Sequence, residues 1–497
     1  MHTKRIVRIG PGLVSALLLS SACAPTPADQ LAHSLAVAPP IVHASGVAAP
    51  APAEFVSFSD TIHGVVIPDP LRWLEDTVAA KTRAWTQSQS VYTDSVLARL
   101  IGRDSIAAGL ERAYSAMPTL GDVVHTPSRT FLARYLGDSP SLMALDSGQT
   151  AERELISAAA LDRLHPGARI RTFVPSWDGR LVALGITMQG DGNAAIVIVD
   201  AANGRVLPDG VPDLLTTTSG TRYQVTWLPD GSGFFYPRLA ALAGGDPSER
   251  LARGRQFLHR IGEPQSADTP VFGFDVSPAV PMDKVDLPTR VGTSANSKWM
   301  FAAVFRSKLN GTDHYAAPLV KDNAAPAWVQ ISAVDDRIGS IALRGDTLYA
   351  LSRKVADRGQ LVRMVLRAGA STPSAWEIVL PERKGVITGY VAQDDGIYFT
   401  ERRRGAISLL RLAPGAKDAE KIALPLTGSV TLARAQSGAG ATLSAESWVS
   451  APHWMFASGD SARRLGVDDG YSASGAADLI TDLIEARSKD GTMVPVS

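Results

Sequence analysis

The sequence predicts an all-β protein, a seven-bladed β-propeller preceded by a short helical segment. Three observations lead to this prediction. After about residue 115 the chain consists of short apolar or alternating runs of four to seven residues separated by turn residues, which is typical of strands. Turns with Asp or Asn beside Gly or Ser recur at a spacing near 50 residues, the length of one four-stranded blade. Before this region, apolar side chains recur at helical spacing.

Residues 1–22 have the order of a bacterial export signal. Basic residues come first, at Lys4, Arg5 and Arg8, and an apolar run too short to span a bilayer follows. Cys23, the only cysteine, stands where a lipoprotein signal places its acylated residue. We therefore expect an exported periplasmic or cell-envelope lipoprotein, held at the membrane by this lipid anchor only. Cleavage after Ala22 without lipidation is the alternative.

Two segments precede the propeller region. Residues 23–53 are rich in alanine and proline without a periodic apolar pattern, so they predict a flexible tether. Residues 54–114 predict a helical segment after a short extended start. Its apolar face is expected to contain Trp85, Tyr92, Val96 and Leu100, which are spaced by seven, four and four residues.

Residues 115–455 predict the propeller, and residues 456–497 a connector. The turn signals are Asp178-Gly179, Asp230-Gly231, Asn296-Ser297, Gly345-Asp346 and Asp395-Gly396. The intervals between their Asp or Asn residues are 52, 66, 50 and 49 residues, so the span holds about seven blades. The long interval predicts an insertion around residues 239–254. Such turns occur in every β protein, so an irregular sandwich or barrel is the alternative.

Charge and composition argue against several function classes. The 49 basic and 49 acidic residues balance, so nothing indicates binding to nucleic acid or to an acidic membrane surface. No phosphate-cradling glycine-rich loop stands between a strand and a helix. The nine histidines lack the spacing of metal ligands; they include His63, His125, His259, His314 and His453. We expect no metal and no cofactor.

Several stretches resemble the prolyl oligopeptidase family, which includes oligopeptidase B. The first contains Asp69, Pro70, Arg72, Trp73, Glu75 and Asp76, with Leu71 where the family usually has Tyr. The second runs from Trp227 to Tyr236, includes Asp230 and Gly231, and continues through His259–Gly262 and Asp268–Phe272. By chemistry alone, the first stretch is an ordinary surface helix in which Arg72 pairs with Glu75 and Asp76 around a buried Trp73 ring. A third stretch, Ser488–Pro495, resembles the strand that enters the family's hydrolase domain.

The resemblance implies the N-terminal, substrate-gating propeller of a serine peptidase acting on short peptides. In the family a C-terminal α/β-hydrolase domain supplies the Ser, Asp and His of the triad. The nucleophile-elbow sequence Gly-x-Ser-x-Gly does not occur in this chain, and no residue matches a triad position. We therefore expect the hydrolase domain to be missing and the chain alone to be inactive.

Two alternatives are open. A stand-alone exported propeller would bind peptides or a protein partner, and a separately encoded hydrolase domain would restore activity. The nucleotide sequence beyond the codon for Ser497 would reveal an adjacent or frameshifted hydrolase frame.

Overall fold

The computed structural model describes residue 47 and residues 50–115, 119–136, 139–187, 193–215, 225–238, 252–320, 324–367, 375–426, 428–433, 438–467 and 479–496. Cys23, the predicted export signal and most of the predicted tether lie outside these residues. The chain divides into two compact units, residues 1–112 and 113–497, which we describe separately. No helix among the described residues is long and apolar enough to cross a membrane.

The first unit contains a hairpin and helices. Strands β1 (Ser59–Ile62) and β2 (Val65–Pro68) pair antiparallel, and the 3-10 helix η1 (Arg72–Glu75) leads to α2 (Ala80–Leu97) and α3 (Arg103–Ser115). The predicted apolar face is wrong at its C-terminal end. Helix α2 ends at Leu97, so Leu100 lies outside it. Gly102 lies between the two helices at φ +85°, a conformation that glycine adopts without a steric penalty.

The second unit contains seven four-stranded antiparallel sheets, and each is built from four consecutive strands. Blade 1 contains β3 (Thr119–His125), β4 (Arg129–Leu136), β5 (Ser139–Asp146) and β6 (Arg153–Ile156). Blade 2 follows α4 (Ala158–Leu164) and contains β7 (Arg169–Pro175), β8 (Leu181–Thr187), β9 (Asn193–Asp200) and β10 (Val206–Leu215). Blade 3 contains β11 (Thr226–Trp227), β12 (Gly233–Arg238), β13 (Arg255–Arg260), η3 (Gln265–Ala267) and β14 (Thr269–Gly273).

The other four blades follow in the same order. Blade 4 contains β15 (Leu287–Gly292), β16 (Trp299–Arg306), β17 (Gly311–Pro318) and β18 (Val329–Ser332), and η4 (Val334–Asp336) comes after it. Blade 5 contains β19 (Ile338–Arg344), β20 (Thr347–Ser352), β21 (Gln360–Val365) and β22 (Glu377–Leu380). Blade 6 contains β23 (Val386–Gln393), β24 (Gly396–Arg403), β25 (Ala406–Leu412) and β26 (Glu420–Lys421). Blade 7 contains β27 (Ser429–Leu432), β28 (Ala441–Ser447), β29 (Ser450–Ser458) and β30 (Ser461–Arg464).

The seven-bladed propeller predicted from the sequence is confirmed, and the recurring turns explain why. Each of the five predicted turns connects the first and second strands of a blade, from blade 2 to blade 6. In two of them, Gly179 and Gly231 have φ values of +69° and +72°, which favour glycine over any residue with a Cβ. The predicted insertion at 239–254 connects β12 to β13, and residues 239–251 lie outside the described part of the chain.

The C-terminal boundary differs from the expected one. Residue 455 lies inside β29, and the propeller continues to Arg464 because β30 completes blade 7. This last strand is short, with three of its four residues exposed, so it lacks the apolar signal of a core strand. Beyond it, β31 (Ile484–Arg487) and β32 (Met493–Val496) form a hairpin. Residues 488–492 of the Ser488–Pro495 stretch form its turn, with Gly491 at φ +88°.

Tryptophan indoles connect neighbouring blades. Trp328 Nε1 in the connection before β18 donates to the Val271 carbonyl of blade 3 at 2.8 Å. At the equivalent place in the next blade, Trp376 Nε1 donates to the Ile331 carbonyl of blade 4 at 2.9 Å. These bonds satisfy polar indole atoms while the rings pack in the apolar layer between two sheets.

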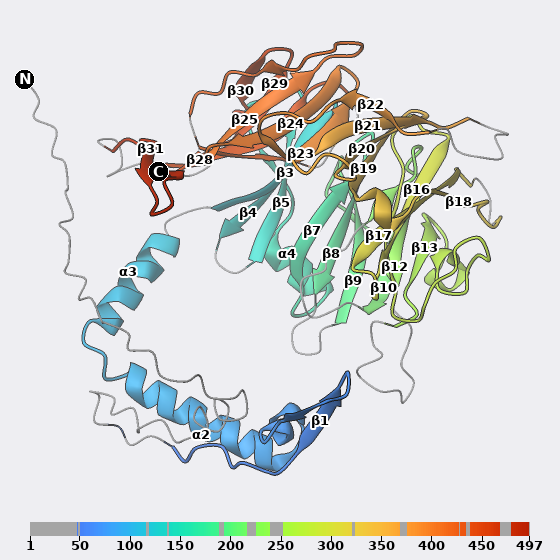
Figure 1. The fold of residues 1–497 in the computed structure, drawn as a ribbon. Coiled ribbons are helices and arrows are strands. Elements are labelled where there is room, and N and C mark those ends of the chain that lie inside the picture. Colours follow the sequence, from blue (N-terminus) through green and yellow to red (C-terminus); the bar gives the residue numbers. More distant parts are fainter. Residues whose placement is uncertain are drawn as a thin grey trace, which may run out of the picture. The chain divides into compact units, whose positions relative to one another are not determined.

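The ring closes through side chains between its first and last blades. Strand β3 contacts β28, and the His125 and Phe456 rings lie 4.9 Å apart, centroid to centroid. Figure 1 shows β28 of the last sheet beside β3. No sheet among the described residues combines strands from both ends of the propeller, so side-chain packing holds this seam.

Candidate functional site

A cavity of about 680 Å³ lies where the first strands of blades 2 to 7 converge. Its wall contains residues of β7, β11, β15, β19, β23 and β27, which places it on the propeller axis. A volume of this size is in the range of pockets that hold small ligands.

The wall combines apolar side chains, hydroxyls and arginines. The aromatic members are Trp177, Trp227, Phe301 and Tyr390. The hydroxyl members are Thr226, Thr293, Ser294, Ser340, Thr388, Thr400 and Thr431. The charged members are Arg290, Arg344 and Arg402, and no carboxylate occurs among the described residues that line the cavity.

The aromatic wall is held by hydrogen bonds between blades 2 and 3. Trp227 is 1% exposed, and its Nε1 donates to the Val174 carbonyl at 2.8 Å. In return, Trp177 Nε1 donates to the Trp227 carbonyl at 3.0 Å. The two blades therefore hold each other at the cavity, and both indoles are fixed.

The side chain of Tyr390 in blade 6 forms hydrogen bonds with blade 5. Its hydroxyl lies 2.7 Å from the Tyr349 carbonyl and 3.0 Å from the Ser340 carbonyl. Burial raises the pKa of this phenol, while its hydrogen bonds and the nearby positive charge of Arg290 oppose the rise. Tyr390 is therefore a neutral donor at physiological pH, and Arg290 lies close to it in the cavity.

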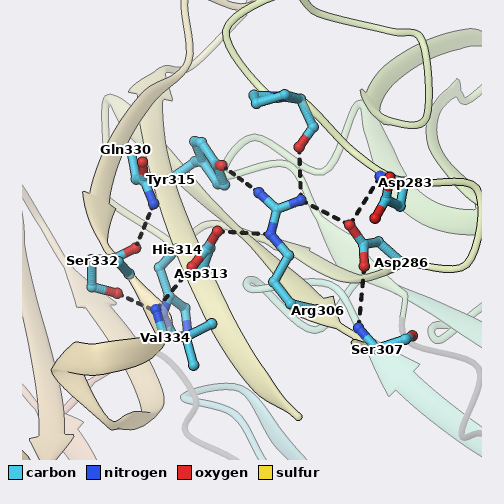
Figure 2. Close-up of polar contacts among 12 residues, drawn as sticks. Asp283, Asp286, Arg306, Ser307, Asp313, His314, Tyr315, Gln330, Ser332 and Val334 are labelled. Atoms are coloured by element: carbon cyan, nitrogen blue, oxygen red, sulfur yellow. Dashed lines mark hydrogen bonds and ion pairs between the residues drawn. The ribbon is translucent and has the colours of Figure 1, made fainter. Parts of the chain in front are cut away.

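Polar contacts in blade 4 fix the strand that carries Arg290. Figure 2 shows Arg306 between two carboxylates: its Nη1 donates to Asp286 at 2.9 Å and its Nε to Asp313 at 2.7 Å. Nη2 also donates to the Tyr315 hydroxyl at 2.9 Å. Asp286 directly precedes β15, Arg306 ends β16 and Asp313 lies in β17, so one guanidinium ties three strands together.

The propeller residues of the predicted motif have distinct places. Trp227 lies in the cavity wall. Asp230 and Gly231 instead form the turn between β11 and β12, where Asp230 Oδ1 accepts bonds from the Ser232 hydroxyl at 2.7 Å and the Ser232 N–H at 3.0 Å. Burial raises the pKa of Asp230, but these bonds outweigh it and hold the pKa below its ordinary value. Only Trp227 of the three belongs to the candidate site.

The N-terminal motif belongs to the first unit. Arg72 pairs with Asp69 and Asp60, both at 2.8 Å, and with Glu75 at 3.2 Å. Pro70 lies between Asp69 and η1, and its carbonyl accepts from the Val56 N–H at 3.0 Å.

Asp76, expected to pair with Arg72, instead accepts backbone hydrogen bonds in the turn before α2. Asp76 Oδ1 accepts from the N–H groups of Val78 and Ala79 just before α2, at 3.1 and 3.0 Å. Trp73, expected to be buried, is only partly so, and it packs edge-on against Trp85 with 6.4 Å between ring centroids. The motif thus organises the start of α2 and brings no reactive group together.

Two of the histidines, His259 and His314, are buried within blades. His259 Nδ1 lies 2.8 Å from Asp268 Oδ1, whose other oxygen accepts from the Tyr236 hydroxyl at 2.7 Å. His314 Nδ1 lies 2.8 Å from the Ser332 hydroxyl. Among the described residues, no group of three His, Cys, Asp or Glu side chains is arranged to hold a metal.

The comparisons with known proteins agree with this architecture. Residues 50–457 match the family model described as the prolyl oligopeptidase N-terminal β-propeller domain. The chain belongs to this family. The resemblance read from the motifs is thereby confirmed, and the match includes both the Asp69–Asp76 stretch and the Trp227–Tyr236 stretch.

Relatives cover much of this chain but only part of their own length. A prolyl endopeptidase of Elizabethkingia meningoseptica is 24% identical over 389 residues, covering 76% of this chain and 50% of the relative. Prolyl oligopeptidase A of Galerina marginata is 25% identical over 240 residues, covering 42% of this chain and 31% of the relative. The chain thus spans about half the length of the Elizabethkingia meningoseptica enzyme.

Solved structures share the fold. One, from a structural and mechanistic analysis of two prolyl endopeptidases, has a TM-score of 0.72 at 20% identity and covers 90% of this chain and 64% of the other. Prolyl oligopeptidase B of Galerina marginata, bound to a 35-residue hydrolysis and macrocyclization substrate, has a TM-score of 0.68 at 15% identity with the same coverage.

Proposed function

We propose that this chain is the substrate-gating propeller of a prolyl-oligopeptidase-like serine peptidase that acts on short peptides. The observation that carries the proposal is the axial cavity of about 680 Å³, lined by six blades of a propeller that belongs to this family. Such a cavity selects by size, since an extended peptide enters it and a folded protein does not. In this family, peptide hydrolysis itself depends on the triad of an α/β-hydrolase domain.

The chain alone is expected to be inactive. No Gly-x-Ser-x-Gly sequence occurs in its 497 residues, and none of its residues corresponds to the family's nucleophile, base or orienting carboxylate. Purified chain incubated with fluorogenic peptides containing proline, and with a second set containing lysine or arginine, should release no fluorophore above the buffer control. Release that a serine-directed phosphonate abolishes would contradict this expectation.

A hydrolase domain supplied on a second polypeptide would restore activity. The apolar residues exposed on the β31–β32 hairpin and in the segment just before it support this idea over a stand-alone binding propeller: Leu479, Ile480, Leu483, Ile484, Met493, Val494 and Val496. Mixing the chain with a hydrolase domain from a related peptidase should suppress the binding of an environment-sensitive dye to this surface. If the isolated chain binds no dye, the stand-alone alternative is favoured.

The proposal includes export and anchoring through Cys23. Its support is the order of basic, apolar and small residues before the only cysteine of the chain. When the full sequence is expressed in a bacterium fed labelled palmitate, the chain should become labelled and fractionate with membranes. A Cys23→Ala variant should lose both properties, and label retained in that variant would refute lipidation at this residue.

A further inference from the structure

We propose that the axial cavity selects peptides that carry carboxylate side chains, with Arg290 and Arg402 as the specificity-determining residues. This inference rests on the proposed function and names the substrate class of the same cavity. Its basis is the charge of the wall. Although the whole chain has equal numbers of basic and acidic residues, the described lining contains three arginines and no aspartate or glutamate.

The arginines come from different parts of the ring. Arg290 lies on β15 of blade 4, and its guanidinium carbon is 5.4 Å from the centroid of the Phe301 ring, itself part of the wall. Arg402 lies on β24 of blade 6 and is exposed. A carboxylate inside the cavity would thus meet positive charge from two sides, beside apolar walls that strengthen electrostatic attraction relative to open water.

Arg344 contributes less to this preference. Its guanidinium already pairs with Asp394 and donates to the Gly438 carbonyl at 3.1 Å. Asp394 lines a neighbouring groove between blades 5 and 6 and is not among the residues that line the axial cavity. The ion pair therefore offsets the charge of Arg344 from outside the cavity.

The alternation of β24 provides a matched pair of variants. Thr400 and Arg402 both line the cavity, as expected for residues two apart on one face of a strand, whereas Arg403 does not. Arg402→Gln and Arg403→Gln therefore remove the same charge from adjacent exposed positions, inside and outside the cavity. Circular dichroism of both variants should match that of the unmodified chain.

The experiment measures binding of short peptides to the full chain by fluorescence anisotropy. The probes are capped six-residue peptides with a neutral coumarin label, identical except for two Glu, two Gln or two Lys. The Glu peptide should bind most tightly, and each arginine contact should contribute about two- to fivefold in affinity. Arg402→Gln should reduce the preference for Glu over Gln by that factor, while Arg403→Gln leaves it unchanged. High salt should also reduce the difference in affinity between the Glu and Gln peptides, because it screens the attraction between carboxylates and arginines.

The outcomes separate the two proposals. Equal binding of the Glu and Gln peptides, tighter binding of the Lys peptide, or equal losses in Arg402→Gln and Arg403→Gln would overturn the charge preference and leave the peptide-binding function standing. Absence of binding by all three peptides would overturn both. A photo-crosslinking Glu peptide should attach to residues of the cavity wall, and attachment elsewhere on the chain would also contradict both.

Discussion

Buried polar side chains hold the blades at the scale of single residues, and His314 is one whose pKa changes on folding. It is 3% exposed, with Nδ1 against the Ser332 hydroxyl. Burial lowers its pKa from 6.5 to about 4, and the carboxylate of the adjacent Asp313 opposes this shift only weakly. The folded protein therefore keeps His314 neutral at pH values where the unfolded chain binds a proton.

Burial of His314 should make the folded protein less stable at acidic pH. Because the folded pKa lies below the unfolded one, the contribution of His314 to stability is complete above pH 6.5 and is lost as the pH falls toward about 4. The loss amounts to about 3 kcal/mol for a shift of this size. Urea unfolding at several pH values between about 7.5 and 4.5 should show this decline, and His314→Gln should flatten it.

An exposed histidine serves as the control. His63→Asn, in the turn at φ 52° where asparagine is tolerated, should leave the pH dependence as it is in the unmodified chain. If His314→Gln and the unmodified chain lose stability in parallel as the pH falls, burial of the imidazole is not the cause.

Turns at the scale of the element determine how blades meet. Gly179 and Gly231 occupy the same turn in blades 2 and 3 with similar φ values of +69° and +72°. Their surroundings differ: a Cβ on Gly179 would lie 2.7 Å from the hydroxyls of Thr126 and Ser128 in blade 1. A Cβ on Gly231 would have only an ordinary contact, 3.9 Å from Ser176.

The two glycines should respond differently to alanine. Gly231→Ala should reduce the free energy of unfolding by about 1 kcal/mol, the cost of a left-handed conformation for a residue with a Cβ. Gly179→Ala should cost about 1 kcal/mol more, because the methyl group also displaces the hydroxyls between blades 1 and 2. Denaturant midpoints measure both, with Gly148→Ala, which faces open space at φ +79°, as a second reference. Equal losses in all three variants would show that the inter-blade contact is unimportant.

The same turns explain what the sequence could and could not reveal. Asp or Asn beside Gly or Ser marks five of the blades because those residues are suited to tight turns. Blade 1 uses Thr126-Pro127-Ser128 instead, with Thr126 Oγ1 donating to the Arg129 carbonyl at 2.9 Å, so composition alone did not mark it. The edge strand β30 was missed for a different reason: an exposed strand carries no apolar alternation.

Part of the cavity wall could also be predicted from the sequence. Arg402, Arg403 and Arg404 form a visible basic run, and the period of a strand separates the faces of the first two. Which face meets the axis depends on ring closure, which brings Arg290 and Arg402 into one cavity across 112 residues of sequence. No local pattern encodes that proximity.

At the scale of the whole molecule, the propeller contains its own apolar cores. The six clusters of buried apolar side chains found among the described residues lie between Val124 and Ala457. A chain of residues 113–497 should therefore unfold cooperatively at the same denaturant concentration as the full chain. Tryptophan fluorescence and far-ultraviolet circular dichroism should give coincident transitions.

A shorter chain provides the control. Residues 113–426 lack blade 7, so the apolar surface of blade 1 that faces the seam and the surface of blade 6 both lose their partner. This chain should unfold at lower denaturant concentration and bind an apolar dye. If it unfolds like residues 113–497, closure of the ring adds little to stability.

The continuity of each blade has a consequence for the order of folding during synthesis. Every blade consists of four strands that follow one another in the chain, so each can pair as soon as its own segment leaves the ribosome. The seam between the first and last blades is different, because the contact between His125 and Phe456 forms only after about 330 more residues have been synthesised. For most of its synthesis the growing chain therefore contains folded blades in an unclosed arc. The axial cavity is enclosed only when the last blade has folded.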